Sequence, residues 1–184
     1  MIRIVEYRPD WPDEYRALAE RLRAVTPPGA QLHHIGSTSV PQLAAKDVID
    51  LQMTVGSLDE VDGAALAGIG FVERPGLSDH APPGAPLPSG ELAKRFFRGG
   101  PRAANLHVRE QGRFNQRYAL LCRDYLRAQP EAAEAYALIK RRLADRFPKD
   151  EDAYYDIKDP VFDILMASAN LWARATGWRL PPGD

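Results

Sequence analysis

The sequence contains two linked segments, His33-His34-Ile35-Gly36-Ser37-Thr38-Ser39-Val40-Pro41 and Lys46-Asp47-Val48-Ile49-Asp50-Leu51-Gln52-Met53. In the first, an apolar run ends at Gly36-Ser37; the interval that follows is long enough for one short helix. A second apolar run then carries Asp50 near its start, so the expected order is strand, turn, helix, strand. Because side chains two apart on a strand share a face, we expect Asp50 and Gln52 to project together, with Asp47 on the other side.

The turn at Gly36 has chemistry suited to phosphate. Gly36 has no Cβ, so the backbone can approach a bulky anion, while Ser37 and Thr38 offer hydroxyls and backbone N–H groups where a helix would begin. A carboxylate such as Asp50 beside a phosphate-binding turn can hold Mg²⁺ against a nucleotide. Without Asp50 at this spacing, ordinary helix capping by Ser37 and Thr38 would be the better interpretation. Together the two features predict a functional site, with Ser37 and Asp50 as its candidate catalytic residues.

This arrangement resembles the nucleotidyltransferase superfamily, whose signature is Gly-Ser, a helical interval and a strand with acidic residues two apart. More narrowly, the segment from Gly36 to Asp50 is similar to the GrpB family, which also occurs fused to dephospho-coenzyme A kinases. The similarity continues over nearly the whole chain, through Val5-Glu6-Tyr7, Trp11, Arg95-Phe96-Phe97-Arg98, Leu106-His107-Val108, Arg123-Asp124-Tyr125-Leu126, Tyr136, Lys140, Tyr154 and Lys158. It implies an α+β fold in which helices flank a nucleotidyltransferase-like mixed β-sheet and a helical bundle follows at the C-terminus.

Length and composition indicate one average globular domain. The chain has 184 residues and a formal net charge of -1, so no strong global field favours nucleic acid or acidic membranes. We expect a single domain over residues 1–178, with a sheet-containing part (1–110), a helical part (111–178) and a frayed tail (179–184). The single cysteine, Cys122, is expected to be a buried thiol. No segment is apolar enough to span a bilayer or serve as a signal core, so we expect a cytoplasmic protein.

Periodicity gives the expected elements. Strands are expected over residues 2–7, up to 36, and over 48–55, 71–73, 93–98 and 105–110, the last two forming a hairpin. Helices are expected from about residue 9 to 25, over 40–45, from a capping box at 57–60 to 69, and along apolar stripes at 114–125, 133–147 and 154–172, the last broken or kinked at Pro160. The proline-rich segment Pro75–Gly90 is expected to be a loop, either a mobile lid or disordered.

A metal site for phosphoryl transfer normally needs two or three converging carboxylates. Asp50 is the only clear one, because Gln52 stands where the wider superfamily has an acid and can offer only a neutral carbonyl. The later strand presents Asn105, His107 and Arg109 on one face. We therefore predict Asp50, Gln52 and His107 as ligands of Mg²⁺, or else a site that binds phosphate without transferring it. A hydrogen-bonded structural role for His107 is the alternative. His33 and His34 point to opposite faces, and one of them is expected to be solvated.

Lysines on apolar helix stripes provide the candidate cations. Lys140 and Lys158 each lie on such a stripe, where a charge is costly unless it is paired or faces a polar cleft; a snorkelling side chain is the commoner explanation. The predicted phosphate-binding set is Gly36, Ser37, Thr38, Lys46, Arg98, Lys140 and Lys158, with Arg95 as a further lining residue. Asp124 is expected to form a structural salt bridge. Of Phe96 and Phe97, one is expected in the core and the other free to stack on a base or to cap the hairpin; the alternative is that both lie in the core.

The leading hypothesis from these features is a nucleotidyltransferase-like protein that binds a nucleoside triphosphate with Mg²⁺ and transfers the nucleotidyl group to an acceptor. The alternative is a non-catalytic nucleotide- or phosphometabolite-binding module with a degenerate active site. A third class, which processes nucleic acid ends, is disfavoured by the balanced charge and the absence of a basic tract. The pattern leaves the acceptor, the base preference and the oligomeric state open.

Overall fold

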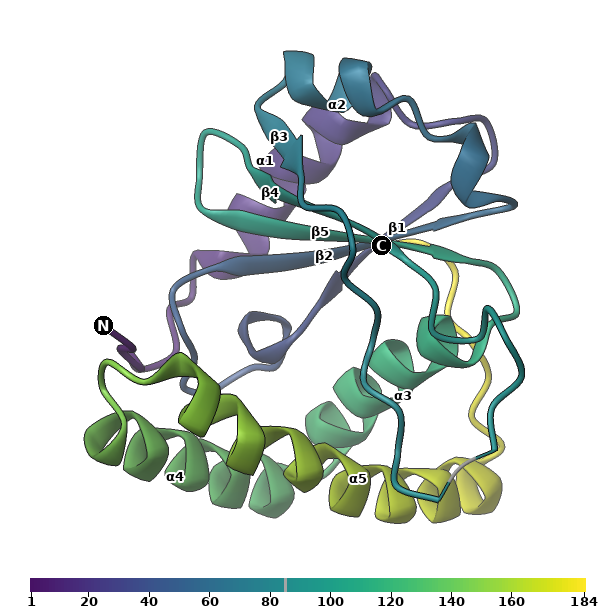
Figure 1. Ribbon diagram of the computed structural model, residues 1–184. Coiled ribbons are helices and arrows are strands. Elements are labelled where there is room, and N and C mark those ends of the chain that lie inside the picture. Colours follow the sequence, from purple (N-terminus) through teal and green to yellow (C-terminus); the bar gives the residue numbers. More distant parts are fainter. Residues whose placement is uncertain (85) are drawn as a thin grey trace.

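The computed structural model describes residues 1–84 and 86–184. In chain order its elements are α1 (Trp11–Arg23), β1 (Gln31–Ile35), the 3₁₀ turn η1 (Ser37–Ser39), β2 (Ile49–Val55), the 3₁₀ turn η2 (Leu58–Glu60), α2 (Gly63–Gly68), β3 (Phe71–Glu73), β4 (Arg95–Gly99), β5 (Ala104–Glu110), α3 (Phe114–Ala128), α4 (Pro130–Arg146) and α5 (Glu151–Thr176). Helices α1 and α2 cover one face of the sheet, and α3, α4 and α5 lie on the other (Figure 1). None of the helices in the described part of the chain combines the length and the hydropathy that crossing a bilayer requires.

The five strands form one mixed sheet in the order β1-β2-β5-β4-β3. Only β2 and β5 pair in parallel, and the other neighbours are antiparallel. In the β1–β2 register Ile35 lies opposite Asp50. The turn that follows Ile35 therefore begins beside Asp50, although the two are far apart in the chain.

Strand β2 separates two environments by simple alternation. Ile49, Leu51, Met53 and Val55 pack with Trp11 and other apolar residues of α1 and α2 in the main core. Asp50, Gln52 and Thr54 point to the opposite face, toward the layer of α3, α4 and α5. This layer has its own apolar cluster, so the helices stay attached without filling the polar face of β2. The predicted α+β class, mixed sheet and C-terminal helical bundle are confirmed.

Three local predictions are wrong, and one alternative of a fourth is excluded. Residues 2–7 form no strand beyond one bridge, Val5 to Ala45. The 3₁₀ turn η1 replaces the short helix expected over 40–45, where Pro41 removes a backbone donor. The predicted capping box is instead a 3₁₀ turn, and Asp62 caps the separate helix α2. Helix α5 continues through Pro160, since its buried side chains on both sides of the proline pack into the helical layer; this excludes the break, and the alternative of a kink stays a prediction.

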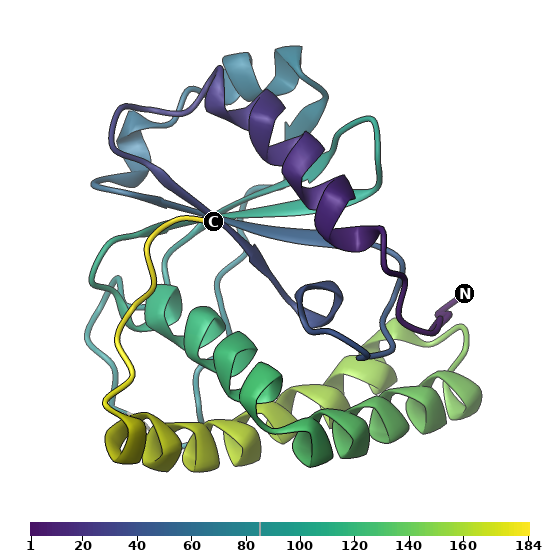
Figure 2. The same ribbon diagram turned by 180° about the vertical axis from the view of Figure 1, so that it is seen from behind.

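The C-terminal residues are ordered against β1, not frayed as expected (Figure 2). The Asp184 carboxylate accepts a hydrogen bond from the backbone N–H of His34 at 2.8 Å and another from Arg123 at 3.1 Å. The backbone N–H of Asp184 donates to the Leu32 carbonyl at 2.9 Å. His33 lies against the carbonyls of this segment, and both His33 and His34 are buried, so the expectation of one solvated histidine is also wrong. The domain limits at residues 110 and 178 stay predictions.

Candidate functional site

A cavity of about 710 Å³ lies between the polar face of the sheet and α3, α4 and α5. Its volume is in the range of small-molecule sites. Every residue of the predicted site except Gln52 lines it: Gly36, Ser37, Thr38, Lys46, Asp50, Arg98, His107, Lys140 and Lys158. The fold therefore brings together residues from η1, β2, β4, β5, α4 and α5.

The wall nearest β1 depends on a glycine. Gly36 has φ +69°, a backbone conformation that residues with a Cβ rarely adopt. A Cβ built at Gly36 would also overlap the Asp50 carboxylate. The missing side chain thus allows the turn and the acid to touch, which gives a physical reason for the Gly-Ser and Asp50 pattern.

Lys140 approaches the same turn from α4. Its Nζ donates a hydrogen bond to Ser37 Oγ at 2.8 Å and another to the Ala44 carbonyl. The residue is only 3% exposed, and both acceptors are uncharged oxygens. Burial, followed by the nearby charges of Lys158 and Arg141, lowers the pKa of Lys140 to about 7. Lys140 is therefore a buried amine beside the turn, and its two hydrogen bonds bring it no negative charge.

Three other predicted cationic side chains line the cavity, and each of them lies over an aromatic ring. Lys46 Nζ donates to the Tyr155 hydroxyl at 3.0 Å and lies 4.7 Å from the Tyr154 ring centre. Lys158 Nζ lies 4.5 Å from the Phe162 ring centre and donates to Asp159 at 2.7 Å. Arg98 lies over Phe96 on β4. The rings hold Lys46 and Arg98 in place without neutralising them, whereas the Asp159 carboxylate already pairs with Lys158.

Arg95 is not part of this group, contrary to expectation. Neighbouring side chains on a strand point to opposite faces of the sheet. Because Phe96 faces the cavity, Arg95 points away from it and pairs with Glu73. By the same alternation Phe97 is fully buried in the core. Phe96 is also buried, at 6% exposure, and packs edge-on against His107 in the cavity wall, 4.8 Å between ring centres. Both rings are therefore buried, which was the alternative to one ring being free to stack on a base.

Asp50 is the acidic centre of the cavity. Its Oδ1 accepts a hydrogen bond from Asn105 Nδ2 at 2.9 Å and lies 3.9 Å from His107 Nε2. Burial alone would raise the pKa of the Asp50 carboxyl, but His107 and Asn105 outweigh burial and hold it below its usual value. Burial lowers the pKa of His107, which favours a neutral imidazole.

These donors fit Mg²⁺ only in part. Within residues 1–84 and 86–184, no three His, Cys, Asp or Glu side chains lie close enough together to hold a metal ion. Mg²⁺ commonly binds through one or two carboxylates, with waters and substrate phosphates completing its shell. Asp50 is thus suited to a Mg²⁺ that arrives with a phosphate ligand, with His107 beside it, and not to a metal site built from protein alone.

The polar side-chain atoms of Gln52 and Thr38 form hydrogen bonds with other protein groups. Gln52 Oε1 accepts from Arg109 at 2.6 Å, and its amide nitrogen donates to Thr54 and to the Gln116 carbonyl. The amide oxygen predicted to ligate metal is therefore already engaged, and Gln52 does not line the cavity. The Thr38 hydroxyl is hydrogen-bonded to His34 Nε2 at 2.9 Å, so its contribution to the turn is structural.

Sequence reasoning missed a buried ion-pair group at the far end of the cavity. Asp79, within the proline-rich loop, accepts hydrogen bonds from Arg109 at 2.7 Å, Lys94 at 2.6 Å and Asn115 at 3.1 Å. These cations hold the pKa of the Asp79 carboxyl well below its usual range even though burial opposes them. No periodic pattern marked Asp79, because a loop residue acquires its partners only through the fold.

The same loop also reaches the helical layer. It runs from β3 past α3 to α5 and back to β4 (Figure 1), and His80 Nε2 lies 2.9 Å from an oxygen of Asp163 on α5. Asp79 and His80 both line the cavity. The loop therefore forms part of the cavity wall, and Asp79 anchors it to the sheet.

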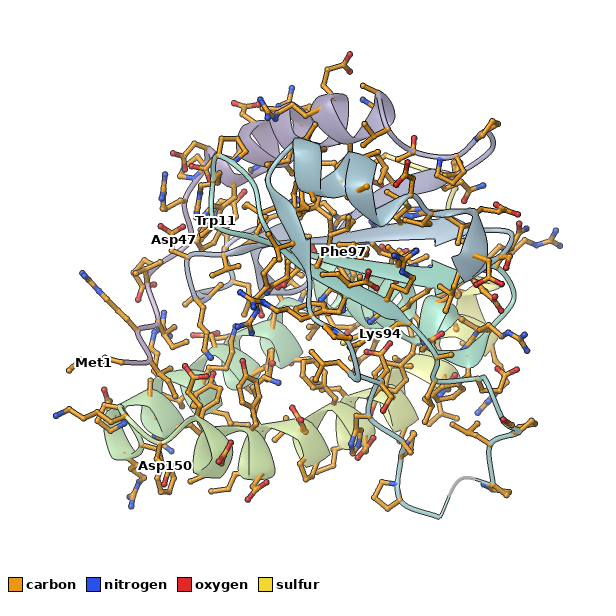
Figure 3. All side chains as sticks on the ribbon, turned by 45° about the horizontal axis from the view of Figure 1, so that its top comes forward. Met1, Trp11, Asp47, Lys94, Phe97 and Asp150 are labelled. Carbon is orange, nitrogen blue, oxygen red and sulfur yellow. The ribbon has the colours of Figure 1, made fainter. Side chains whose placement is uncertain are left out.

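Three further residues have structural roles. Asp47 lies beside Trp11, away from the cavity (Figure 3), and accepts a hydrogen bond from the indole N–H at 2.8 Å. Asp124 pairs with Arg123 at 2.8 Å, so its partner is an arginine and not one of the stripe lysines. Cys122 is buried, and burial raises the pKa of its thiol to about 12.

Comparison with known proteins identifies the family. The family model described as GrpB protein matches residues 1–168. The crystal structure of conserved protein GrpB from Enterococcus faecalis matches with a TM-score of 0.74 and 30% identity, covering 92% of this chain and 99% of that one. The predicted resemblance is therefore confirmed over nearly the whole chain.

Two curated relatives are much longer than this chain. UPF0157 protein YqkA of Bacillus subtilis is 33% identical over 94% of this chain, and dephospho-CoA kinase of Mycolicibacterium paratuberculosis is 34% identical over 97%. The chain spans 48% of each of them. This chain belongs to the GrpB family.

Proposed function

We propose that the cavity binds a nucleoside triphosphate together with one Mg²⁺. Gly36, Ser37 and Lys140 bind phosphate, Lys46, Lys158 and Arg98 neutralise the rest of the phosphate charge, and Asp50 meets the metal beside His107. The observation that carries the proposal is the buried amine of Lys140, whose hydrogen bonds go only to the uncharged oxygens of Ser37 and Ala44.

The cost of burying an ammonium group explains why this observation favours an anion. A buried charge without a counter-charge is unfavourable by several kcal/mol, and the protein relieves the cost by shifting the pKa toward the neutral form. A phosphate beside Ser37 would supply the counter-charge and accept a hydrogen bond from the serine hydroxyl. Lys46 and Arg98 lie over aromatic rings, which leaves their charge available to an anionic ligand, whereas Lys158 shares its charge with Asp159.

The geometry supports binding more directly than transfer. Nucleotidyl transfer by two metals needs further carboxylates near Asp50, and Asp79, the other well-buried acid of the cavity wall, is held by three donors of its own. If the protein is an enzyme, one metal ion and the cationic side chains of the cavity must therefore stabilise the charge that develops during transfer. The non-catalytic binding module remains the second candidate, favoured by this shortage of acids.

The name of one relative supports the proposed class of ligand. One of them is named dephospho-CoA kinase, and its name implies a nucleotide-containing substrate. Because this chain spans 48% of that relative, the name supports a nucleotide-like ligand and does not extend to the kinase reaction. The acceptor of any transferred group is not indicated.

Titration calorimetry with ATP, GTP, CTP and UTP, with and without Mg²⁺, tests the binding proposal. We expect binding that Mg²⁺ tightens, a loss of about tenfold in affinity in Ser37→Ala because one hydrogen bond is removed, and loss of the Mg²⁺ effect in Asp50→Asn. Asp145→Asn, an exposed acid outside the cavity, is the matched control and should bind as the wild type does. Absence of triphosphate binding, or a Mg²⁺ effect that survives in Asp50→Asn, would contradict the proposal.

Release of pyrophosphate then separates the two candidates. Turnover with a panel of small-molecule acceptors, abolished in Asp50→Asn, would establish the enzyme. Tight binding without release from any acceptor would favour the binding module. Salt-sensitive binding to oligonucleotides, in preference to free triphosphates, would instead indicate the nucleic-acid class.

A further inference from the structure

Helix α5 exposes a regular row of large apolar side chains. Ile157, Ile164 and Leu171, here called the α5 stripe, are 48%, 70% and 62% exposed. They are seven residues apart, so they lie along one face of the helix. Met166 and Ala169 are buried on the opposite face, and α5 belongs to the layer farthest from the sheet (Figure 1). The α5 stripe therefore faces outward.

The residues around the α5 stripe suit contact with another helix. A seven-residue apolar repeat is the pattern of a seam between packed helices. Ala167, Ser168 and Ala175 lie close to the stripe and are also exposed, and small side chains allow two helices to approach closely. Scattered exposed apolar residues need no explanation, but a regular seven-residue apolar repeat on one helix face indicates an interaction surface.

Charges beside the α5 stripe indicate what covers it. The exposed Asp156 lies eight residues before Ile164, and the exposed Arg174 lies ten residues after it. With about 3.6 residues per turn, both fall on the same side of the stripe at similar distances from its centre. The beginning of α5 is acidic and its last turn is basic. A second copy of the helix, reversed in direction, would match both the apolar row and the charges.

We propose that the α5 stripe is the interface between two copies of this chain, packed antiparallel about a two-fold axis at Ile164. Ile157 of each copy meets Leu171 of the other, and Asp156 of each copy pairs with Arg174 of the other. Such an interface is self-complementary, as two-fold symmetry requires. A parallel pair would bring together the acidic beginnings of both helices, which disfavours that arrangement.

Sedimentation equilibrium of the full chain tests the association. We expect twice the monomer mass, and at least a hundredfold weaker association in Ile164→Asp, which places two carboxylates at the axis and removes two buried apolar side chains. Leu138→Asp, at a 44% exposed leucine on the neighbouring helix α4, is the matched control and should remain dimeric. A monomeric wild type, or a dimer that Ile164→Asp leaves intact, would overturn the proposal and indicate that a different partner covers the stripe.

Charge exchange and cross-linking test the direction of the two helices. Asp156→Arg and Arg174→Asp should each weaken association about tenfold, and the double variant should restore it, because the exchanged charges again face each other. Ile164→Cys should form a disulfide-linked dimer in the antiparallel arrangement. Ile157→Cys alone should not, whereas a mixture of Ile157→Cys and Leu171→Cys should. Cross-linking of Ile157→Cys to itself would contradict the antiparallel geometry.

Discussion

The polar face shared by β2 and β5 has two halves that differ in how their groups are paired. At one end Asp50 meets only the neutral donor of Asn105 and the His107 ring. At the other end, the Arg109 guanidinium donates hydrogen bonds to Gln52 and Asp79, and Lys94 donates a further one to Asp79. The strands and the face are the same, so the difference comes from what the neighbouring segments bring to each end.

The difference in pairing indicates that the Asp79 end stabilises the fold and that the Asp50 end binds a ligand. The Asp79 end joins a loop to the sheet through buried charges that satisfy one another, so it has little left to offer a ligand. The Asp50 end, with Ser37 and Lys140 across from it, keeps an acid and a buried amine in an open cavity. A polar cluster is a candidate binding site where its pairing is incomplete, and a structural one where it is complete.

The largest expected effect comes from breaking the paired end. Asp79→Ala leaves Arg109 and Lys94, which are 6% and 9% exposed in their side chains, without their shared counter-charge. We expect a loss of about 3–5 kcal/mol in the free energy of unfolding, measured by urea denaturation. Asp50→Ala, at the unpaired end, should cost only about 1 kcal/mol, since its hydrogen-bond partner is a neutral amide. Equal losses in the two variants would remove the distinction between the ends.

A smaller effect is expected at the turn beside Asp50. Gly36→Ala combines a positive φ with an overlap between the new Cβ and the Asp50 carboxylate, so we expect a loss of about 2–3 kcal/mol and weakened triphosphate binding. Gly29→Ala is the control, because Gly29 also has a positive φ, +79°, but no atom lies within 4 Å of its Cβ position. It should cost about 1 kcal/mol and leave binding unchanged. A loss in Gly36→Ala no larger than in Gly29→Ala would show that the contact with Asp50 is unimportant.

Binding should also depend on pH through Lys140. Its pKa is about 7 in the free protein, and a bound phosphate would raise it. Above pH 7 binding must therefore take up a proton, so affinity for inorganic triphosphate should fall by up to tenfold per pH unit, about 1.4 kcal/mol. Below pH 7 Lys140 is already protonated and this dependence should disappear.

Calorimetry in buffers of different ionisation enthalpy measures the proton uptake. Lys140→Met should bind more weakly and show no uptake between pH 7 and 9, while Lys149→Met, at an exposed lysine outside the cavity, should behave as the wild type. Uptake that persists in Lys140→Met would assign it to another group.

The smallest effect is expected where the loop meets α5. The contact between His80 and Asp163 is partly exposed, with side-chain exposures of 39% and 16%, so His80→Ala should change the free energy of unfolding by less than about 1 kcal/mol. Hydrogen exchange should nevertheless increase at the backbone N–H groups of His80, Ala81 and Gly84, while the backbone N–H of Asp79, bonded to the Leu92 carbonyl at 3.1 Å, keeps its protection. Loss of protection at both positions would mean that the loop opens as one unit.

Much of the fold could be predicted because its signals are local. The alternation of β2, the apolar stripes of the C-terminal helices and the turn at Gly99 depend on residues close together in the chain. Local signals failed where packing competes with them. Pro160 lies inside a continuous helix and the tail is held by Asp184, because contacts with distant segments outweigh the local preference for a break or for disorder.

For the site, the sequence alone determined the pairing of the Gly36-Ser37 turn with Asp50, because neighbouring antiparallel strands place the end of one beside the start of the next. Only the tertiary structure decided which distant side chains complete it. Lys140 reaches Ser37 across 103 residues of chain, and Asp79 pairs with Arg109 from within a loop that has no periodic pattern. Charges buried in this way acquire their partners through the packing of separate segments, and no spacing along the chain records that packing.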